Sequence, residues 1–133
     1  MRSFTRRFSD KSGQASVEFA LVLSVLVLVL MGTLELGRVA HAYLTVSHAS
    51  REAARAAALG KTDEEVASVA RSAAPSLDPV RLSVTVSPSF TTRVGGQPVT
   101  VRVSYSETIL VPLIAAIAPN PFPVEAETVM RTE

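Results

Sequence analysis

The chain has 133 residues, enough for one small domain with an appendage, and 47% of them are hydrophobic while only 5% are aromatic. It has 13 Lys and Arg against 12 Asp and Glu, but four of the basic residues and only one acid lie within residues 1–13. The positive charge is thus a short flank, which argues against nucleic-acid binding, since that needs a basic face on the folded part. The absence of cysteine excludes disulfides and thiolate metal sites.

An uncharged, strongly apolar run covers residues 19–34. Its sixteen residues would form a helix about 24 Å long, somewhat shorter than the ~30 Å hydrocarbon core of a bilayer. Flanking apolar residues extend the run, so we predict a transmembrane helix over about residues 19–36. The run is interrupted only by Ser24, Gly32 and Thr33, and its charged neighbours, which can snorkel outward, are Glu18, Glu35 and Arg38.

The basic flank precedes this run, and positive charge stays on the cytoplasmic side of a membrane. We therefore predict a single-pass protein of the cytoplasmic membrane, with its N-terminus inside and everything after Gly37 extracytoplasmic.

Three interpretations of the N-terminal region compete. The first is a membrane anchor that is never cut. The second is a secretory signal peptide cut after the small-x-small sequence at residues 40–42, which would leave Tyr43 first; the run is long for that, and Glu35 and Arg38 lie between it and the cut. The third is a prepilin, and only this one accounts for an acid, Glu18, at the mouth of the apolar run.

The stretch GQASVEF resembles the type IV prepilin cleavage motif, in which a basic leader ends in glycine and a glutamate stands fifth after the cut, before an aromatic residue. Gly13, Glu18 and Phe19 match these positions. A glycine suits a cleavage site, because it has no Cβ to crowd an extended backbone. The resemblance implies that a prepilin peptidase removes residues 1–13 and leaves Gln14 as a new N-terminus, which the family commonly methylates.

A longer stretch resembles a narrower family, the TadE-like minor pseudopilins of the tight-adherence (Tad/Flp) type IV pilus system. The features that carry the resemblance are Val17 to Leu21, Gly32, Glu35 to Arg38, and the alanine-rich segment from Ala49 to Ala58. The resemblance covers residues 13–60 well and the remainder only in general layout. The chain departs from the family at Ser24, where members often have proline, so its helix is expected to be straighter.

This resemblance implies a structural protein of an adhesion and secretion system that assembles through its N-terminal helix. Its partners would be the peptidase, other pilin or pseudopilin subunits and the Tad assembly platform, with a cell-surface pilus as the destination. In the family, the residue matching Glu18 is thought to pair with the N-terminal amine of an adjoining subunit. The resemblance also gives Glu35 and Arg38 a role in contacts between helices.

The apolar run continues into an amphipathic helix, and together they predict a rod over residues 14–60 that ends at a glycine cap, Gly60. We expect the part of the apolar stripe far from the membrane to pack on the protein's own globular domain. The part near the membrane, which we call the lower part, is expected to contact other molecules. The apolar stripe is Leu36, Val39/Ala40, Tyr43, Val46/Ser47, Ser50, Ala53/Ala54 and Ala57. The polar stripe is Glu35, Arg38, His41, Thr45, His48, Glu52 and Arg55.

Residues 61–133 predict a small extracytoplasmic α+β domain. A short helix begins at Thr62, which forms a capping box with Glu65, and it ends before Pro75. An alternating apolar pattern then predicts three strands, over residues 80–87, 99–107 and 124–133, with Val80 on the inner face of the first. The fold class is therefore α+β, in which the long helix and the short helix pack on a three-stranded antiparallel sheet. Arg81 and Arg102 are placed to meet Glu125 and Glu127 across neighbouring strands.

The segment 109–123 is apolar but punctuated by proline, and it is too short to span a bilayer. We expect a short helix to start at Pro112. The favoured interpretation is that the segment covers the sheet, and the alternative is an exposed patch that docks a neighbouring subunit.

No catalytic arrangement stands out in the sequence, and we predict neither an enzyme nor a cofactor. His41 and His48 share a helix face, but no third ligand stands at helical spacing, so the pattern favours a solvated polar face over a metal site. The function predicted is that of a minor pilin or pseudopilin. The alternative is an uncleaved, membrane-anchored extracytoplasmic binding module.

Overall fold

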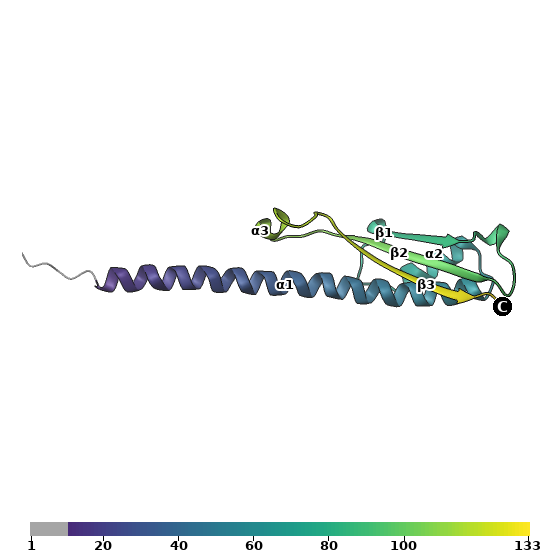
Figure 1. The fold of residues 1–133 in the computed structure, drawn as a ribbon, viewed down its shortest axis with the longest axis horizontal. Coiled ribbons are helices and arrows are strands. Elements are labelled where there is room, and N and C mark those ends of the chain that lie inside the picture. Colours follow the sequence, from purple (N-terminus) through teal and green to yellow (C-terminus); the bar gives the residue numbers. More distant parts are fainter. Residues whose placement is uncertain (1–10) are drawn as a thin grey trace, which may run out of the picture.

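A computed structural model describes residues 11–133, with side chains from residue 13 onward. One very long helix runs the length of the molecule, and the other elements gather around its C-terminal half (Figure 1). This arrangement confirms the predicted α+β fold of a long apolar helix, a short helix and a three-stranded antiparallel sheet. The elements in chain order are α1 (Lys11–Ala58), α2 (Asp63–Ser72), a 3₁₀ turn (Pro79–Arg81), β1 (Leu82–Ser87), a second 3₁₀ turn (Phe90–Thr92), β2 (Pro98–Glu107), α3 (Pro112–Ala115) and β3 (Phe122–Arg131).

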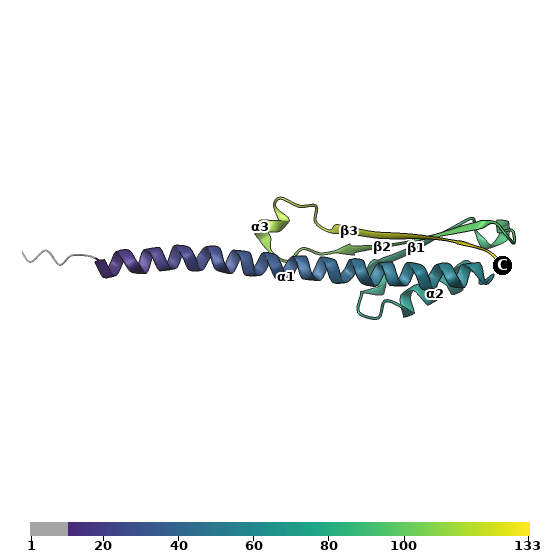
Figure 2. The ribbon, with the colours of Figure 1, turned by 60° about the horizontal axis from the view of Figure 1, so that its bottom comes forward.

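The end of α1 follows the sequence closely. Gly60 adopts a φ of 77°, a left-handed conformation that favours glycine and stops the helix. The N–H groups of Gly60 and Lys61 donate to the carbonyls of Ala57 and Ala56, at 3.1 and 3.2 Å. The chain therefore turns back sharply, and α2 runs alongside the last turns of α1 (Figure 2).

The sheet has the order β1-β2-β3, with both pairs antiparallel. The alternating pattern predicted its inner face well: Val99, Val101 and Val103 are fully buried on β2. Their cross-strand neighbours include Val84 of β1 and Ala126 of β3, which both lie opposite Val103.

The prediction for Val80 is wrong. It is 92% exposed and lies in the 3₁₀ turn that precedes β1. The reason is local: Pro79 opens the turn, and the Asp78 carboxylate accepts the Val80 N–H at 3.0 Å, so the strand begins only at Leu82.

Of the predicted cross-strand ion pairs, Arg102 meets Glu127 at 2.6 Å, which raises the pKa of Arg102, mainly through the hydrogen bond. Arg81 instead pairs with Asp78 at 3.6 Å.

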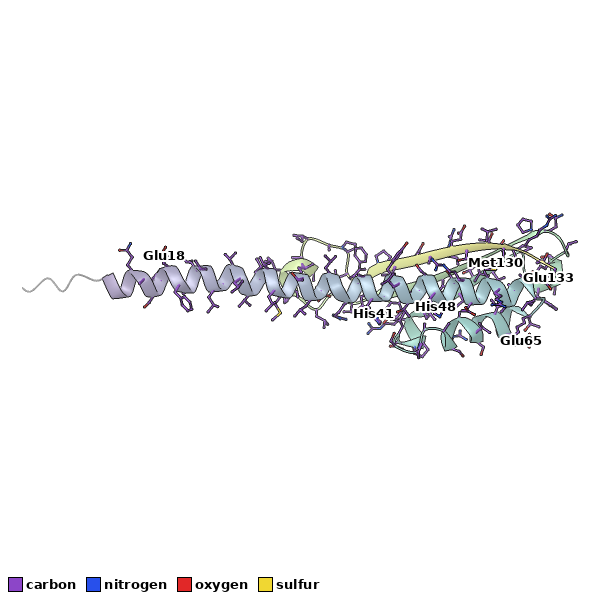
Figure 3. The ribbon with its side chains drawn as sticks, turned by 90° about the horizontal axis from the view of Figure 1, so that it is seen from below. Glu18, His41, His48, Glu65, Met130 and Glu133 are labelled. Atoms are coloured by element: carbon purple, nitrogen blue, oxygen red, sulfur yellow. The ribbon has the colours of Figure 1, made fainter. Side chains whose placement is uncertain are left out.

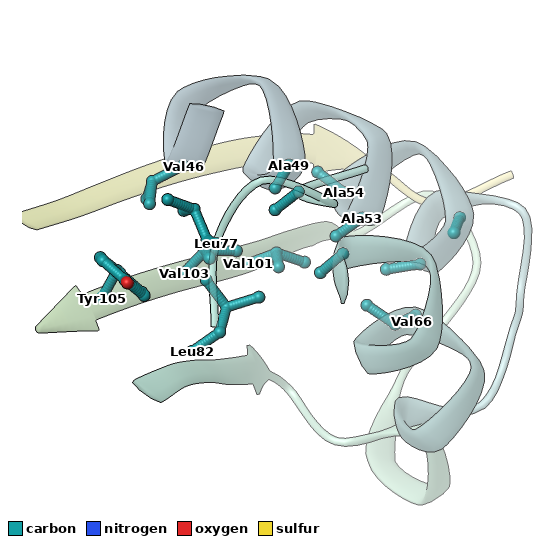
Figure 4. Packing of buried hydrophobic residues seen from close by; sticks show 14 of the residues in the cluster. Val46, Ala49, Ala53, Ala54, Val66, Leu77, Leu82, Val101, Val103 and Tyr105 are labelled. Atoms are coloured by element: carbon teal, nitrogen blue, oxygen red, sulfur yellow. The ribbon is translucent and has the colours of Figure 1, made fainter. Parts of the chain in front are cut away.

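The core lies where the C-terminal half of α1, α2 and the inner face of the sheet meet (Figure 4). The side of α1 that faces it consists mostly of alanines, whose small side chains let the helix lie close to the strands. Ser50, the one polar residue of α1 buried within this core, donates to the Ser47 carbonyl at 3.0 Å and shares a 2.8 Å hydrogen bond with Thr128 of β3. Its hydroxyl is thereby satisfied inside the core.

The lower part of the predicted apolar stripe is left uncovered by the protein itself, as expected, but other residues are buried at this level. Leu36 and Tyr43 are 70% and 53% exposed, whereas Ala42 and Glu35 are buried. Successive residues of a helix point about 100° apart. The face that meets the rest of the protein is thus displaced by one residue from the most apolar face, and the expectation that Glu35 lies on an exposed polar face is wrong.

The predicted capping box at the start of α2 is confirmed. The Glu65 N–H donates to the Thr62 hydroxyl at 3.3 Å, and the Thr62 N–H donates to the Glu65 carboxylate at 2.9 Å. These bonds, first the one from the Thr62 backbone and then the one from its hydroxyl, hold the pKa of Glu65 below its usual value. The cap therefore fixes the direction in which α2 leaves the turn at Gly60.

The sequence did not indicate a second set of contacts at this end of the molecule, made by Arg93. The side chain of Arg93 is only 5% exposed and pairs with Asp63, in the first turn of α2, at 2.5 Å. It also donates to the carbonyls of Ala57 and Lys61, at 3.2 and 2.9 Å. A cation at the last carbonyls of α1 suits the negative end of that helix, so Arg93 ties α1, α2 and the loop before β2 together.

The close approach of α1 to the sheet leads to a stability prediction. Replacing the fully buried Ala53 by leucine is expected to destabilise the fold by about 1–3 kcal/mol, because the added atoms have no free volume to occupy. Ala40→Leu, on an exposed part of the same helix, is the matched control and should change stability little. Urea unfolding of the full chain in detergent micelles, followed by circular dichroism, measures both. Equal midpoints for the two variants would contradict this account of the packing.

Candidate membrane and assembly site

The N-terminal half of α1 is bare. Its large apolar side chains from Val17 to Leu34 are 43–67% exposed, and no other described element packs around most of this length (Figure 1). Within residues 11–133, α1 is the one helix that is long and apolar enough to cross a membrane, judged by length and composition. An apolar surface of this extent needs lipid or other helices to cover it.

The hydroxyl groups inside this run are satisfied by the helix itself. Ser24 donates to the Ala20 carbonyl at 2.7 Å, and Thr33 donates to the Val29 carbonyl at 2.9 Å. Such bonds to the preceding turn let serine and threonine sit in an apolar environment without a further partner. Position 24 is thus a regular part of α1.

The residues of the predicted processing and assembly site all lie in the first turns of α1. Gly13, Gln14, Glu18 and Phe19 are exposed, and Figure 3 shows Glu18 far from the sheet. No ion pair joins Glu18 to another side chain that the structure describes. Most of the predicted leader, residues 1–10, lies outside the described residues. In the uncut chain Gly13 is helical, although a peptidase would need it extended.

A cluster of three charged side chains lies where the bare half of α1 ends. Arg38 pairs with Glu35 at 3.3 Å and with Glu107, the last residue of β2. Both carboxylates are buried, and 41% of the Arg38 side chain is exposed. Glu35 also accepts the backbone N–H of Leu110 at 3.1 Å. The cluster therefore binds the end of β2 and the following segment to the middle of α1.

Sequence reasoning predicted contacts for Glu35 and Arg38 but missed Glu107. A signal was present, because the buried residues of β2 are at odd positions from Val99 to Tyr105, and Glu107 continues that series. A carboxylate at an inward-facing position of a strand needs a cationic or hydrogen-bonding partner. The alternation thus indicated that Glu107 is paired, although it could not indicate with which residue.

The apolar segment after β2 lies beside α1, beyond the end of the sheet (Figures 1 and 2). A short helix, α3, starts at Pro112 as predicted. The favoured expectation that the segment covers the sheet is wrong for α3, because Ile114 reaches toward Gly32, where a Cβ atom would lie 3.9 Å from its terminal methyl carbon. Ile109 is buried, whereas Leu110, Leu113 and Ile117 are 65%, 55% and 84% exposed.

The two histidines lie on the side of α1 that faces the loop after α2 (Figure 3). The ring of His41 is 3.1 Å from the Ser76 hydroxyl, and His48 is exposed. Among the residues that the structure describes, no group of three or more His, Cys, Asp or Glu side chains could hold a metal ion.

The fold and this site together define a class: an α+β protein whose N-terminal helix is long enough to cross a membrane and is bare over its first half. The family model described as TadE-like protein matches residues 13–55, which are nearly all of α1. The long N-terminal helix is therefore similar to that of TadE-like proteins, and the resemblance seen in the sequence is confirmed over these residues. The match ends before α2. Neither the curated proteins nor the solved structures include a match to the chain.

Proposed function

We propose that the protein is a structural minor pilin or pseudopilin of a Tad type IV pilus, held in the cytoplasmic membrane by α1 with its N-terminus inside. A prepilin peptidase cleaves it after Gly13, and residues 61–133 form its extracytoplasmic domain. One observation carries the proposal: the TadE-like match falls on a helix that is buried by its own protein only in its C-terminal half. A helix of that kind can hold the subunit in the membrane before assembly and then pack against identical or related helices.

The assembly step would use the same bare surface twice. In the bilayer, lipid covers the apolar side chains; in the filament, helices of other subunits cover them, so the transfer exchanges one apolar environment for another. Glu18 is the exception, because a carboxylate gains most from a cationic partner in low dielectric. The amine created at Gln14 of an adjoining subunit would supply that partner and fix the axial register.

The second candidate is an uncleaved membrane anchor that carries a binding module. The observation that favours it is the continuity of α1 through Gly13, since an uncut chain would keep this helix intact. A signal peptide cut at residues 40–42 is less compatible with the structure. That cut falls within α1, next to the buried side chain of Ala42.

The mature N-terminus distinguishes these candidates. Co-expression with a prepilin peptidase, followed by intact mass and N-terminal sequencing, is expected to give a chain that starts at Gln14 and has lost 13 of its 133 residues. Gly13→Ala is expected to leave the full-length mass, because a Cβ crowds the backbone that the peptidase must extend. Gly37→Ala is the matched control: the same change in the same helix, with nothing within 4 Å of the new Cβ, should be processed normally. A mature chain starting at Met1 would support the anchor, and one starting at Tyr43 a secreted protein.

A further inference from the structure

The segment of residues 109–121, which we call the foot, is the least expected apolar surface of the protein. It contains no charged residue, and its single polar side chain is that of Asn120. Three large aliphatic side chains point away from the protein: Leu110, Leu113 and Ile117. Apart from Asn120, the exposed side chains of the foot are thus apolar, unlike those of an ordinary surface loop.

The foot lies at the level where the apolar run of α1 ends. Its α3 helix packs at Gly32. This residue lies two positions, or about 3 Å along α1, before Leu34, the last residue of the apolar run 19–34. Leu34 and Met31 of α1 line one groove together with Leu110 and Pro112 of the foot. If residues 19–34 fill the hydrocarbon core, the foot therefore lies at its outer edge, and its apolar surface continues that of the span.

Most of the backbone of the foot is also suited to a nonaqueous environment, where an unsatisfied N–H group is costly: seven of its ten N–H groups donate to an acceptor within the described residues, and those of Val111, Leu113 and Asn120 do not. Ile109 donates to the Asn120 side chain at 3.1 Å and Leu110 donates to Glu35. The five N–H groups from Ile114 to Ala118 donate to backbone carbonyls within the foot. Prolines 112, 119 and 121 have no N–H to satisfy. The amide of Asn120, in turn, donates to the Ile109 carbonyl at 3.3 Å, so the one polar side chain is used internally.

The charged cluster of Glu35, Arg38 and Glu107 forms the border above the foot. Arg38, of which 41% of the side chain is exposed, borders the groove between α1 and the foot, and an arginine at this level can reach lipid headgroups. The order along the molecule is therefore apolar span, apolar foot, then charge, which is the order that a bilayer and its interface present.

We propose that the foot inserts into the outer interfacial region of the cytoplasmic membrane, with Leu110, Leu113 and Ile117 among the lipid chains. A second protein is the less suitable occupant, because protein interfaces surround an apolar centre with hydrogen-bonding groups, and the one polar side chain of the foot, that of Asn120, is already bonded to Ile109. The inference rests on the part of the proposed function that places α1 across the membrane, and not on cleavage or polymerisation. Two contacts, α1 and the foot, would then fix the height and tilt of the sheet above the bilayer.

The absence of cysteine allows a direct test. Single variants Ile117→Cys, Val25→Cys and Val80→Cys are labelled with an environment-sensitive nitrobenzoxadiazole fluorophore and reconstituted in phosphatidylethanolamine–phosphatidylglycerol vesicles, with and without lipids that carry a spin label near the headgroup. All three side chains are well exposed, at 84%, 62% and 92%, so labelling should not disturb the fold. We expect blue-shifted emission for the labels at positions 117 and 25, quenching by the spin label at position 117, and neither effect at position 80.

The outcomes separate the two claims. A blue-shifted label at position 25 with a water-like, unquenched label at position 117 would overturn the foot and leave the membrane span standing. A water-like label at position 25 would overturn both. Quenching at position 117 that persists on dilution of the protein in lipid supports insertion. A blue shift there that disappears on dilution would show that a second copy covers the foot, which overturns lipid as the occupant.

Discussion

Glu18→Ala is expected to leave membrane insertion intact and to abolish incorporation into pili. Insertion depends on the apolar run that follows, and removing a carboxylate only lowers its cost, since a charged residue near the bilayer centre costs about 2.5–3.5 kcal/mol and less toward the interface. Incorporation depends, under the proposed function, on the pairing of Glu18 with the amine of an adjoining Gln14. Immunoblots of the membrane fraction and of sheared pili, in a host that assembles the wild-type protein, measure the two steps separately.

Two control variants identify the cause. Glu18→Gln keeps the size of the side chain and removes its charge, so it should fail at the same step if the charge matters. Ser24→Ala removes a polar group from the same bare helix, but that group is bonded only within its own helix, so assembly should be normal. A Glu18→Ala protein that reaches sheared pili at the wild-type level would refute the pairing.

The parts of the fold that rest on local rules could be predicted from the sequence. The capping box at Thr62 and the glycine stop at Gly60 each need only a few adjacent residues, and both are confirmed. The alternating pattern placed β2 to within one residue, because its inner face is uniformly apolar. At Val80 the same rule failed, since a proline turn outweighs a periodic pattern at its edge.

Features that depend on topology could not be predicted in the same way. Arg81 cannot meet Glu125, because β1 and β3 lie on opposite sides of β2, which strand periodicity does not reveal. The burial of Glu35 has the same origin. Glu107, the other carboxylate that pairs with Arg38, is 72 residues further along the chain, and only the path of β2 back along α1 brings the two to one arginine.

The position of the foot is a further consequence of that path. Leu82, the first residue of β1, lies opposite Tyr105, so the hairpin of β2 and β3 extends past β1 by Ser106 and Glu107, along α1 toward the apolar run. An apolar segment at the tip of such a hairpin reaches the level of Gly32. The sequence showed that residues 109–123 are apolar, but the choice between covering the sheet and meeting another surface depended on where the hairpin tip lies.

The charged cluster should hold the foot against α1, so Arg38→Met is expected to loosen that part of the protein. The change leaves the buried carboxylates of Glu35 and Glu107 without a cation. Breaking a fully buried ion pair costs about 3–5 kcal/mol, and the 41% exposure of the Arg38 side chain reduces this through solvent screening, so we expect about 2 kcal/mol. Thermal unfolding in micelles should show the loss, and the Leu110 amide, which donates to Glu35, should exchange its hydrogen faster.

Arg51→Met is the matched control, because Arg51 is exposed on the same helix and makes no ion pair with another described side chain. Adding Glu35→Gln and Glu107→Gln to Arg38→Met should recover part of the stability, since no buried charge is then left unpaired. That recovery distinguishes electrostatics from the packing of the arginine stem, which the triple variant does not restore. If Arg38→Met and Arg51→Met unfold alike and the Leu110 amide keeps its protection, the foot is held by the contact of Ile114 with α1 and not by charge.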